Sequence, residues 1–189
     1  MAEDQVKGAI ERTVAEARRA VDAHGVSDSA MQLIREALRR LAETPGLEDH
    51  AGRLRELHGS DAAATVLASE GPEGLTLVLG RFLPDAPTPV HDHGSWGIIY
   101  VLKGHDRYVH WQRLDDGTNP ERAQLIVEHE KVLGPGDSTH WFDPPKDIHS
   151  QQGHGDTVLE LVLFGRDTMR APRHYFDVET GRVAVRRPQ

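Results

Sequence analysis

The chain has 189 residues, of which 38% are hydrophobic and 28% charged, and its net charge is −8. This length suits one domain with a substantial core and is too short for two ordinary domains. The acidic balance disfavours a general nucleic-acid binder or a protein held on anionic membranes, because both need clustered basic side chains. The absence of cysteine excludes disulfides, thiolate zinc sites and a cysteine nucleophile. Any metal must therefore be held by imidazole and carboxylate groups.

The sequence carries no targeting signal that we recognise. Residues 1–6 lack a basic segment followed by an apolar one, so we expect no signal peptide. No run approaches the length of about 18 apolar residues that a membrane span requires. We therefore expect a cytoplasmic protein, a monomer or a homodimer, with a small-molecule substrate and neither a membrane nor a nucleic-acid partner.

Residues 1–60 are predicted to form a helical segment that packs on the outside of the following domain. A first helix stops at Gly25, and a second begins at a cap formed by Ser27 or Ser29. Each helix has an apolar stripe at three- and four-residue spacing. The two stripes consist of Val6, Ile10, Val14, Ala17 and Val21, and of Met31, Ile34, Leu38 and Leu41. A third short helix is predicted from Leu47, Leu54 and Leu57, and it should close near Gly59.

From residue 62 the pattern changes to short apolar runs separated by glycine, proline and aspartate. The runs cover residues 64–68, 75–83, 97–103, 107–114, 124–133 and 158–164. Many short strands with regular turns and no alternating helices indicate an antiparallel sandwich or barrel. We expect this β domain to cover residues 61–182, and residues 183–189 to be a loose tail.

Three histidines form a candidate metal site. His91 and His93 are two residues apart in an extended segment, so their imidazoles point to the same side and can hold a first-row divalent ion together. An isolated His-x-His can equally be a pair of surface histidines. Here, however, the pair precedes a strand that begins at Gly97, and His149 follows the rigid Pro144-Pro145 turn at the start of another strand region. A closed barrel can bring such a third ligand to the pair.

The segment from His91 to Gly104 resembles the first cupin motif, in which two histidines precede an acidic ligand and a closing glycine. The acidic position falls on Gly97. Loss of that carboxylate is a feature of the cysteine dioxygenase-like cupins, the thiol dioxygenases, which bind iron through three histidines. Similarity to that family extends to 134–137, 147–149 and 174–181, within residues 62–182. The resemblance implies a mainly β fold, the cupin double-stranded β-helix barrel.

The resemblance also implies a function. The three histidines match the iron ligands of the family, so His91, His93 and His149 are expected to bind Fe(II) in a dioxygenase that converts a small thiol to a sulfinate. The family's relay tyrosine falls on Phe164, and its carboxylate-binding arginine has no counterpart between Asp61 and Gly80. Both departures argue against cysteine as the substrate.

Other side chains could contact the substrate in place of the missing groups. Arg81 could reach an anionic group, with a solvent-facing strand arginine as the alternative, and Tyr100 could line the pocket, with a core tyrosine as the alternative. Asp147 could orient a ligand imidazole or cap a turn. Trp141 is expected near the pocket rim, and His140 is expected in a loop.

Two other functions fit the sequence. The first is a cupin that uses nickel, manganese or zinc for an isomerisation, a hydrolysis or a different dioxygenation, because imidazole ligands suit several of these ions. The second is a barrel that binds a small molecule without turning it over. The absence of the family's tyrosine and arginine keeps this binding function open.

Overall fold

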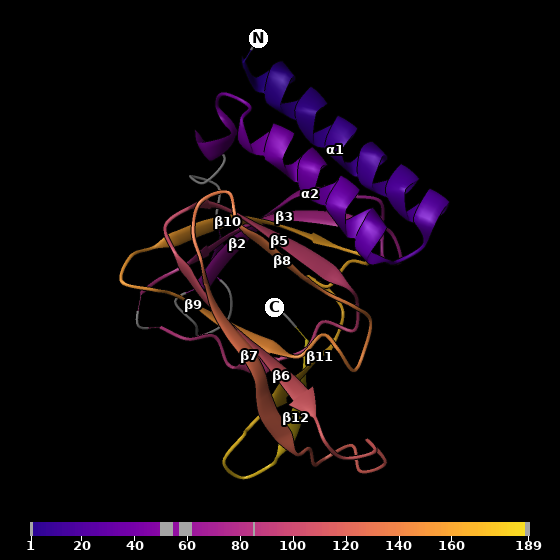
Figure 1. Cartoon of the computed structure of the whole chain (residues 1–189), viewed down its shortest axis with the longest axis vertical. Helices are drawn as coiled ribbons and strands as arrows, with labels where there is room; N and C mark the ends of the chain where they lie inside the picture. The colour runs from indigo at the N-terminus through magenta and orange to yellow at the C-terminus, as the bar shows by residue number, and fades with distance from the viewer. Residues whose placement is uncertain (1, 50–54, 57–61, 85, 188–189) are drawn as a thin grey trace.

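A computed structural model describes residues 2–49, 55–56, 62–84 and 86–187. In these ranges, two N-terminal helices pack against one of two antiparallel sheets (Figure 1). The helices are α1 (Ala2–His24) and α2 (Asp28–Ala42). Gly25 ends α1 with a φ of 64°, and the Ser27 hydroxyl accepts a hydrogen bond from the Ala30 amide at the start of α2. Both predicted helices therefore form, with the stop and the cap where the sequence indicates them.

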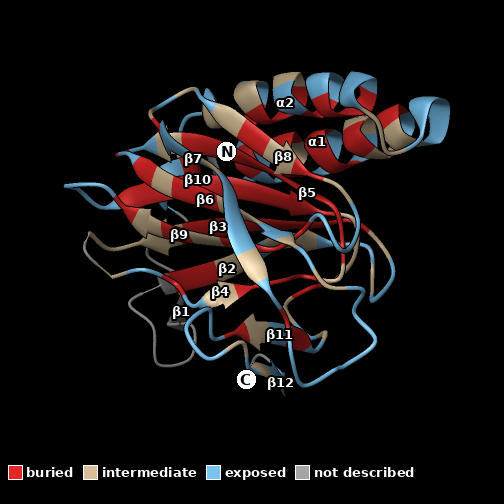
Figure 2. Ribbon diagram, turned by 60° about the horizontal axis from the view of Figure 1, so that its bottom comes forward, coloured by how far each residue is buried: buried red, intermediate tan, exposed pale blue. Residues whose placement is uncertain are grey.

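The helices cover one sheet because their apolar stripes are buried against it. Ile10 and Leu38 join a cluster that includes Leu79 and Leu161 from the neighbouring strands. Figure 2 shows this arrangement, with buried residues on the sides of the helices that face the strands and exposed residues on the opposite sides. No helix in the described ranges is long and apolar enough to cross a membrane.

In the described part of that segment, the predicted third helix is present only as one turn of 3-10 helix at residues 47–49. After it, β1 (Arg55–Glu56) pairs antiparallel with β2 (Ala62–Ser69). Leu54, Leu57 and Gly59 lie outside the described residues. Leu47 is buried in the cluster between the helices and the sheet. Backbone pairing with β2 thus replaces the local helix that the leucine spacing suggested.

The two sheets have six strands each within the described ranges. Sheet A has the order β1-β2-β3-β10-β5-β8, and sheet B has the order β12-β11-β4-β9-β6-β7. The further strands of sheet A are β3 (Thr76–Phe82), β10 (Val158–Phe164), β5 (Gly97–Lys103) and β8 (Ser138–Trp141). Those of sheet B are β12 (Val183–Arg186), β11 (Arg173–Phe176), β4 (Val90–His91), β9 (His149–Gly153), β6 (Asp106–Arg113) and β7 (Leu125–Leu133).

The strand pairing confirms the predicted fold class. Strands β3, β4, β5 and β6 pair antiparallel with β10, β9, β8 and β7 respectively, as one long hairpin would. Along this hairpin the strands alternate between sheet A and sheet B, so the hairpin is wound into a double-stranded β-helix. A second apolar cluster, which includes Ile99, Tyr108 and Val162, fills the space between the two sheets.

Several strands are too short to be predicted from their own pattern, although the sequence indicated an extended segment at His91 and a strand region at His149. Strands β4, β8, β9 and β11 have two to five residues each, too few to show a clear alternation. Residues 183–186, expected in the tail, form β12 and pair with β11. The alternation of Val183 and Val185 fits a strand, and Val183 packs against the small cluster that contains Phe176.

Candidate metal centre

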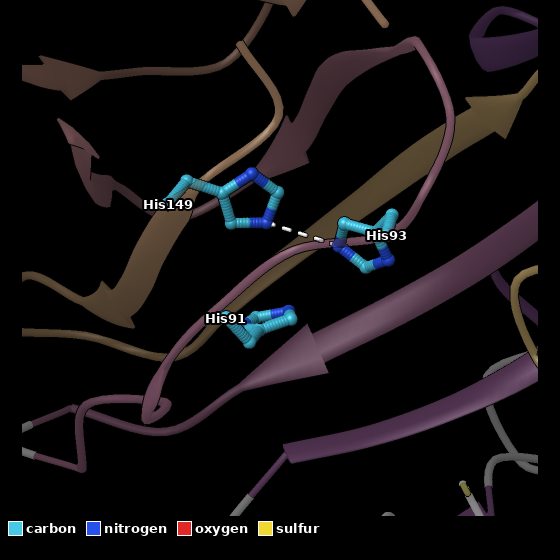
Figure 3. Close-up of side chains that lie close together, drawn as sticks. All are labelled: His91, His93 and His149. Carbon is cyan, nitrogen blue, oxygen red and sulfur yellow. Dashed lines mark hydrogen bonds between the residues drawn. The ribbon is translucent and has the colours of Figure 1, made fainter. Parts of the chain in front are cut away.

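The barrel brings the three histidines together from two separate stretches of the chain (Figure 3). His91 ends β4, His93 follows two residues later, and His149 begins β9. His91 and His149 are direct partners in the β4–β9 pairing. The Nε2 atoms of His93 and His149 are 3.1 Å apart, and each of the three rings offers a nitrogen within 4.8 Å of the others. This spacing suits a single ion bound by three imidazoles.

Contacts at the outer nitrogens set how two of the rings point. The Nδ1 of His91 lies 2.8 Å from the Pro89 carbonyl oxygen, so it carries the proton and leaves Nε2 free as a ligand. The Nδ1 of His149 lies 3.5 Å from the Tyr108 hydroxyl. The Nδ1 of His93 is buried without a hydrogen-bond partner.

Asp147 holds the backbone of the histidine segment. One carboxylate oxygen accepts hydrogen bonds from the His93 amide at 3.0 Å and the Gly94 amide at 2.7 Å. Gly94 has a φ of 64°, so the chain turns sharply here. These two hydrogen bonds to backbone amides are those of a turn-capping residue. Its action on His93 passes through the backbone.

Burial keeps the three imidazoles neutral. It lowers the pKa of His91 to about 3 and the pKa values of His93 and His149 well below their usual range. Charge repulsion from the Arg173 guanidinium lowers all three pKa values further. Neutral rings have the free lone pairs that metal binding requires, so no proton has to be displaced from an imidazolium at neutral pH.

Aromatic rings surround the histidines. Trp141 lies edge-on to His149 with ring centroids 4.6 Å apart, and Tyr175 stacks on His91 at 5.9 Å. The same tryptophan leaves no room for a side chain at position 97, because a Cβ on Gly97 would lie 2.3 Å from the Trp141 ring. An acidic ligand at that position therefore does not fit this barrel.

The structure separates the three candidate substrate-contacting residues. The Phe164 ring lies 4.7 Å from the His93 ring, between the two sheets. Tyr100, by contrast, belongs to the cluster beneath the helices. Arg81 is the direct partner of Leu159, a residue of that same cluster. Because paired residues share a sheet face, Arg81 and Tyr100 point away from the histidines, and their expected places at the site are corrected here.

Arg173 is a buried cation whose charge lowers the pKa values of all three histidines. It was not predicted from the sequence as a residue of the site. It begins β11 and its residue is 8% exposed. Its Nε and Nη2 donate hydrogen bonds to the Thr168 carbonyl, which fixes the plane of the guanidinium. The one sequence signal was its position directly before the segment 174–181, which resembles the thiol dioxygenases.

Trp141 and His140 lie in different places from those predicted. Trp141 is 2% exposed and packs on the histidines inside the barrel, deeper than a rim residue would. His140 lies on β8, where we expected a loop, and its Nε2 is 3.1 Å from the Asp28 carboxylate of α2. It therefore links the strand to the helix and does not face the histidines.

Several solved structures are similar to this chain, whereas comparisons of the sequence alone find no match. No family model matches the sequence, and no curated protein matches it. KdgF from Halomonas sp. has a TM-score of 0.44 and 17% identity, covering 59% of this chain and 84% of that chain. An RmlC-like cupin protein from Ralstonia eutropha JMP134 has a TM-score of 0.45 and 17% identity, covering 69% of each.

A third similar structure is an oxalate oxidase in complex with the substrate analogue glycolate. It has a TM-score of 0.43 and 18% identity, and the match covers 57% of this chain and 52% of that chain. The match thus spans about half the length of the oxalate oxidase. Because the three TM-scores are below 0.5, the fold is assigned from the strand pairing and not from these similarities.

Proposed function

We propose that the protein is a mononuclear iron(II) dioxygenase that oxidises a small anionic thiol, other than cysteine, to a sulfinate. The observation that carries the proposal is the donor set, which consists of three buried neutral imidazoles. A carboxylate ligand at position 97 is excluded by the Trp141 ring. The resemblance of the histidine segment to the thiol dioxygenases agrees with this donor set.

Among the described residues, the group of possible metal ligands at this centre consists of three histidines and includes no carboxylate. Asp147 turns one oxygen to two backbone amides, and Asp92 contacts the amide and the ring of His174. The ligand set is therefore neutral, and a divalent ion would keep its full charge, which favours an anionic substrate. When bound, iron(II) supplies redox chemistry with adjacent open positions for substrate and oxygen.

The proposed reaction balances without another reactant. A thiolate, RS⁻, and O₂ give RSO₂⁻, so sulfur forms two S–O bonds and is oxidised by four electrons, which dioxygen accepts as its O–O bond breaks. No external reductant is needed. The chain's part is to hold the reactants together and to limit water, which lowers the entropic cost of the encounter. Trp141 and Phe164 supply the apolar walls beside the histidines.

The test combines metal analysis with oxygen uptake. Protein purified without added metal is expected to carry iron, and oxygen uptake is expected with 3-mercaptopropionate in preference to cysteine or cysteamine. The reason is that only 3-mercaptopropionate combines a thiol with a net-anionic remainder that Arg173 can attract. The proposal would be contradicted if iron-loaded protein consumed no oxygen with any of the three thiols.

A second candidate function is a cupin with another divalent metal. The all-imidazole donor set favours it as well, because imidazole also binds nickel, manganese and zinc. The same metal analysis separates the two functions. Manganese or nickel in place of iron, together with no thiol-dependent oxygen uptake, would support this second candidate.

Arg173 is proposed to attract the carboxylate of the substrate. In an Arg173→Met variant we expect KM for 3-mercaptopropionate to rise by about ten-fold or more, the size of one lost charged hydrogen bond. The value of kcat should change less, and KM for cysteamine should not rise. Steady-state oxygen uptake measures each constant. An Arg170→Met variant is the control, because Arg170 is exposed in the same segment. Equal effects on anionic and cationic thiols would contradict this role.

A further inference from the structure

Four histidines lie side by side across four neighbouring strands of sheet B. His91 of β4 pairs with His149 of β9, His149 pairs with His110 of β6, and His110 pairs with His129 of β7. Directly paired residues point to the same face of a sheet. The first two histidines belong to the metal centre described above. The other two, His110 and His129, have no part in it.

A β-bulge places a carboxylate beside this second pair. His110 pairs with His129, but the next residue of β6, Trp111, pairs with Val127, so Glu128 is an extra residue on β7. A bulge of this kind re-aims side chains that would otherwise alternate. Glu128 consequently lies on the same side as its neighbour His129, and its Oε2 is 2.7 Å from the Nδ1 of His110. The rings of His110 and His129 are 4.9 Å apart.

We infer that His110, Glu128 and His129 form a second divalent-metal site, suited to a zinc-type ion. Each residue offers one ligand atom, and these atoms lie within 4.8 Å of one another. Two imidazoles and one carboxylate, with water in the fourth position, match the ligands that zinc takes in open tetrahedral sites. In such a site neighbouring ligand atoms are about 3.4 Å apart. The half-exposed Glu128 side chain can make the small adjustment that is needed.

The other nitrogen of His110 supports this inference. Its Nε2 lies 2.9 Å from the Lys146 carbonyl oxygen, so His110 meets an acceptor at each ring nitrogen. A neutral ring can donate to only one of them. With the proton on Nε2, a lone pair on Nδ1 faces the Glu128 carboxylate, and a cation between them relieves the repulsion. Metal-bound histidines typically donate their second nitrogen to a carbonyl in this way. The competing arrangement is a protonated His110 that pairs with Glu128.

The two sites are close but would hold separate ions. One lies between β4 and β9 and the other between β6 and β7, which is two strand spacings away, about 10 Å. Ions of a two-metal centre are only about 4 Å apart. The second ion would therefore be structural. Through His110 it would hold Lys146, three residues before the ligand His149.

The test is zinc binding to metal-free protein, measured by isothermal titration, and it is independent of the proposed oxidation. We expect two equivalents in the natural chain. One equivalent should remain in His91→Ala, where the first site is broken, and one in Glu128→Gln or His129→Ala. The combined His91→Ala/His129→Ala variant should bind none. Circular dichroism before titration checks that each variant is folded.

Glu130→Gln is the matched control. Glu130 is on β7, as Glu128 is, and its exposed carboxylate forms an ion pair with Arg107. It should keep two equivalents. The inference is overturned if His91→Ala binds no zinc, because the second site must then be only an ion pair. It is overturned equally if the equivalent left in His91→Ala persists after His129→Ala is added. If the numbers of zinc equivalents are as expected but the natural chain does not oxidise thiols, only the proposed function is contradicted.

Discussion

Replacing His91 with alanine is expected to abolish iron binding at the three-histidine centre and thiol-dependent oxygen uptake while the barrel stays folded. His91 supplies one of three ligand nitrogens, and two imidazoles without a carboxylate hold a divalent ion poorly. Loss of groups that only orient a ligand costs about 10- to 100-fold in metal affinity, so loss of a ligand should cost more than about 100-fold. His91 is preferred to His149 for this test because His149 is the direct partner of His110.

Two measurements check this expectation. The first is iron content after anaerobic loading. The second is the rise in thermal stability on adding iron, which should be about 2.7 kcal/mol at 100 times the dissociation constant in the natural chain and close to zero in His91→Ala/His129→Ala, which lacks both metal sites. His105→Ala is the matched control, because His105 is exposed and contacts Asp156 away from the site. A His91→Ala protein with a full iron complement would show that iron binds elsewhere.

The grouping of the three histidines could be predicted because part of its signal is local. Two histidines two residues apart define a direction in an extended chain, whatever the fold. Which strand supplies the third ligand depends on register. The direct pairing of His91 with His149 follows from the winding of the hairpin and has no local sequence signature. The resemblance to a known family selected His149, and the strand pairing explains why it is in reach.

The sheet faces of the candidate substrate-contacting residues were harder to predict because both faces of sheet A are buried. On β5, Ile99 faces the barrel interior and Tyr100 faces the helices, yet both are almost fully buried. In a strand with one solvent-exposed face, polar residues alternate with apolar ones and identify the outer face. Here the helices cover the outer face, so both faces are apolar and the sequence does not show which residues point inward. The same ambiguity placed Arg81 at the site.

The interior also holds two carboxyl groups that no strand pattern predicts. Asp106 and Glu160 are both fully buried, and the Gln151 amide nitrogen donates hydrogen bonds to one oxygen of each, at 3.1 and 3.0 Å. Their remaining oxygens have no partner. Burial raises the pKa of Asp106 to about 7 and the pKa of Glu160 well above its usual value. Glu160 lies on the inward face of β10, as does Phe164.

The contribution of this pair to the stability of the protein should decrease as pH rises. A carboxyl whose pKa is higher in the folded than in the unfolded chain is favoured while protonated, so its contribution is complete below about pH 4 and is lost as pH rises towards 7. For Asp106, the shift from 3.8 to about 7 corresponds to a loss on the order of 4 kcal/mol. The three buried histidines act in the opposite direction below about pH 6.5, because their pKa values are lowered in the folded chain. The fall due to the carboxyls is therefore measured as the difference in unfolding free energy, from urea titrations, between the natural chain and variants that lack one of them.

Glu160→Gln and Asp106→Asn should each flatten this fall, because an amide of similar shape has no charge to bury. Both variants should be more stable than the natural chain at pH 8 and close to it at pH 4. Glu121→Gln removes an exposed carboxylate and should leave the slope unchanged. Parallel stability curves for Glu160→Gln and the natural chain would mean that the buried carboxyls ionise without cost. That outcome would require water or a cation beside them, since an unpaired charge is not stable in a dry interior.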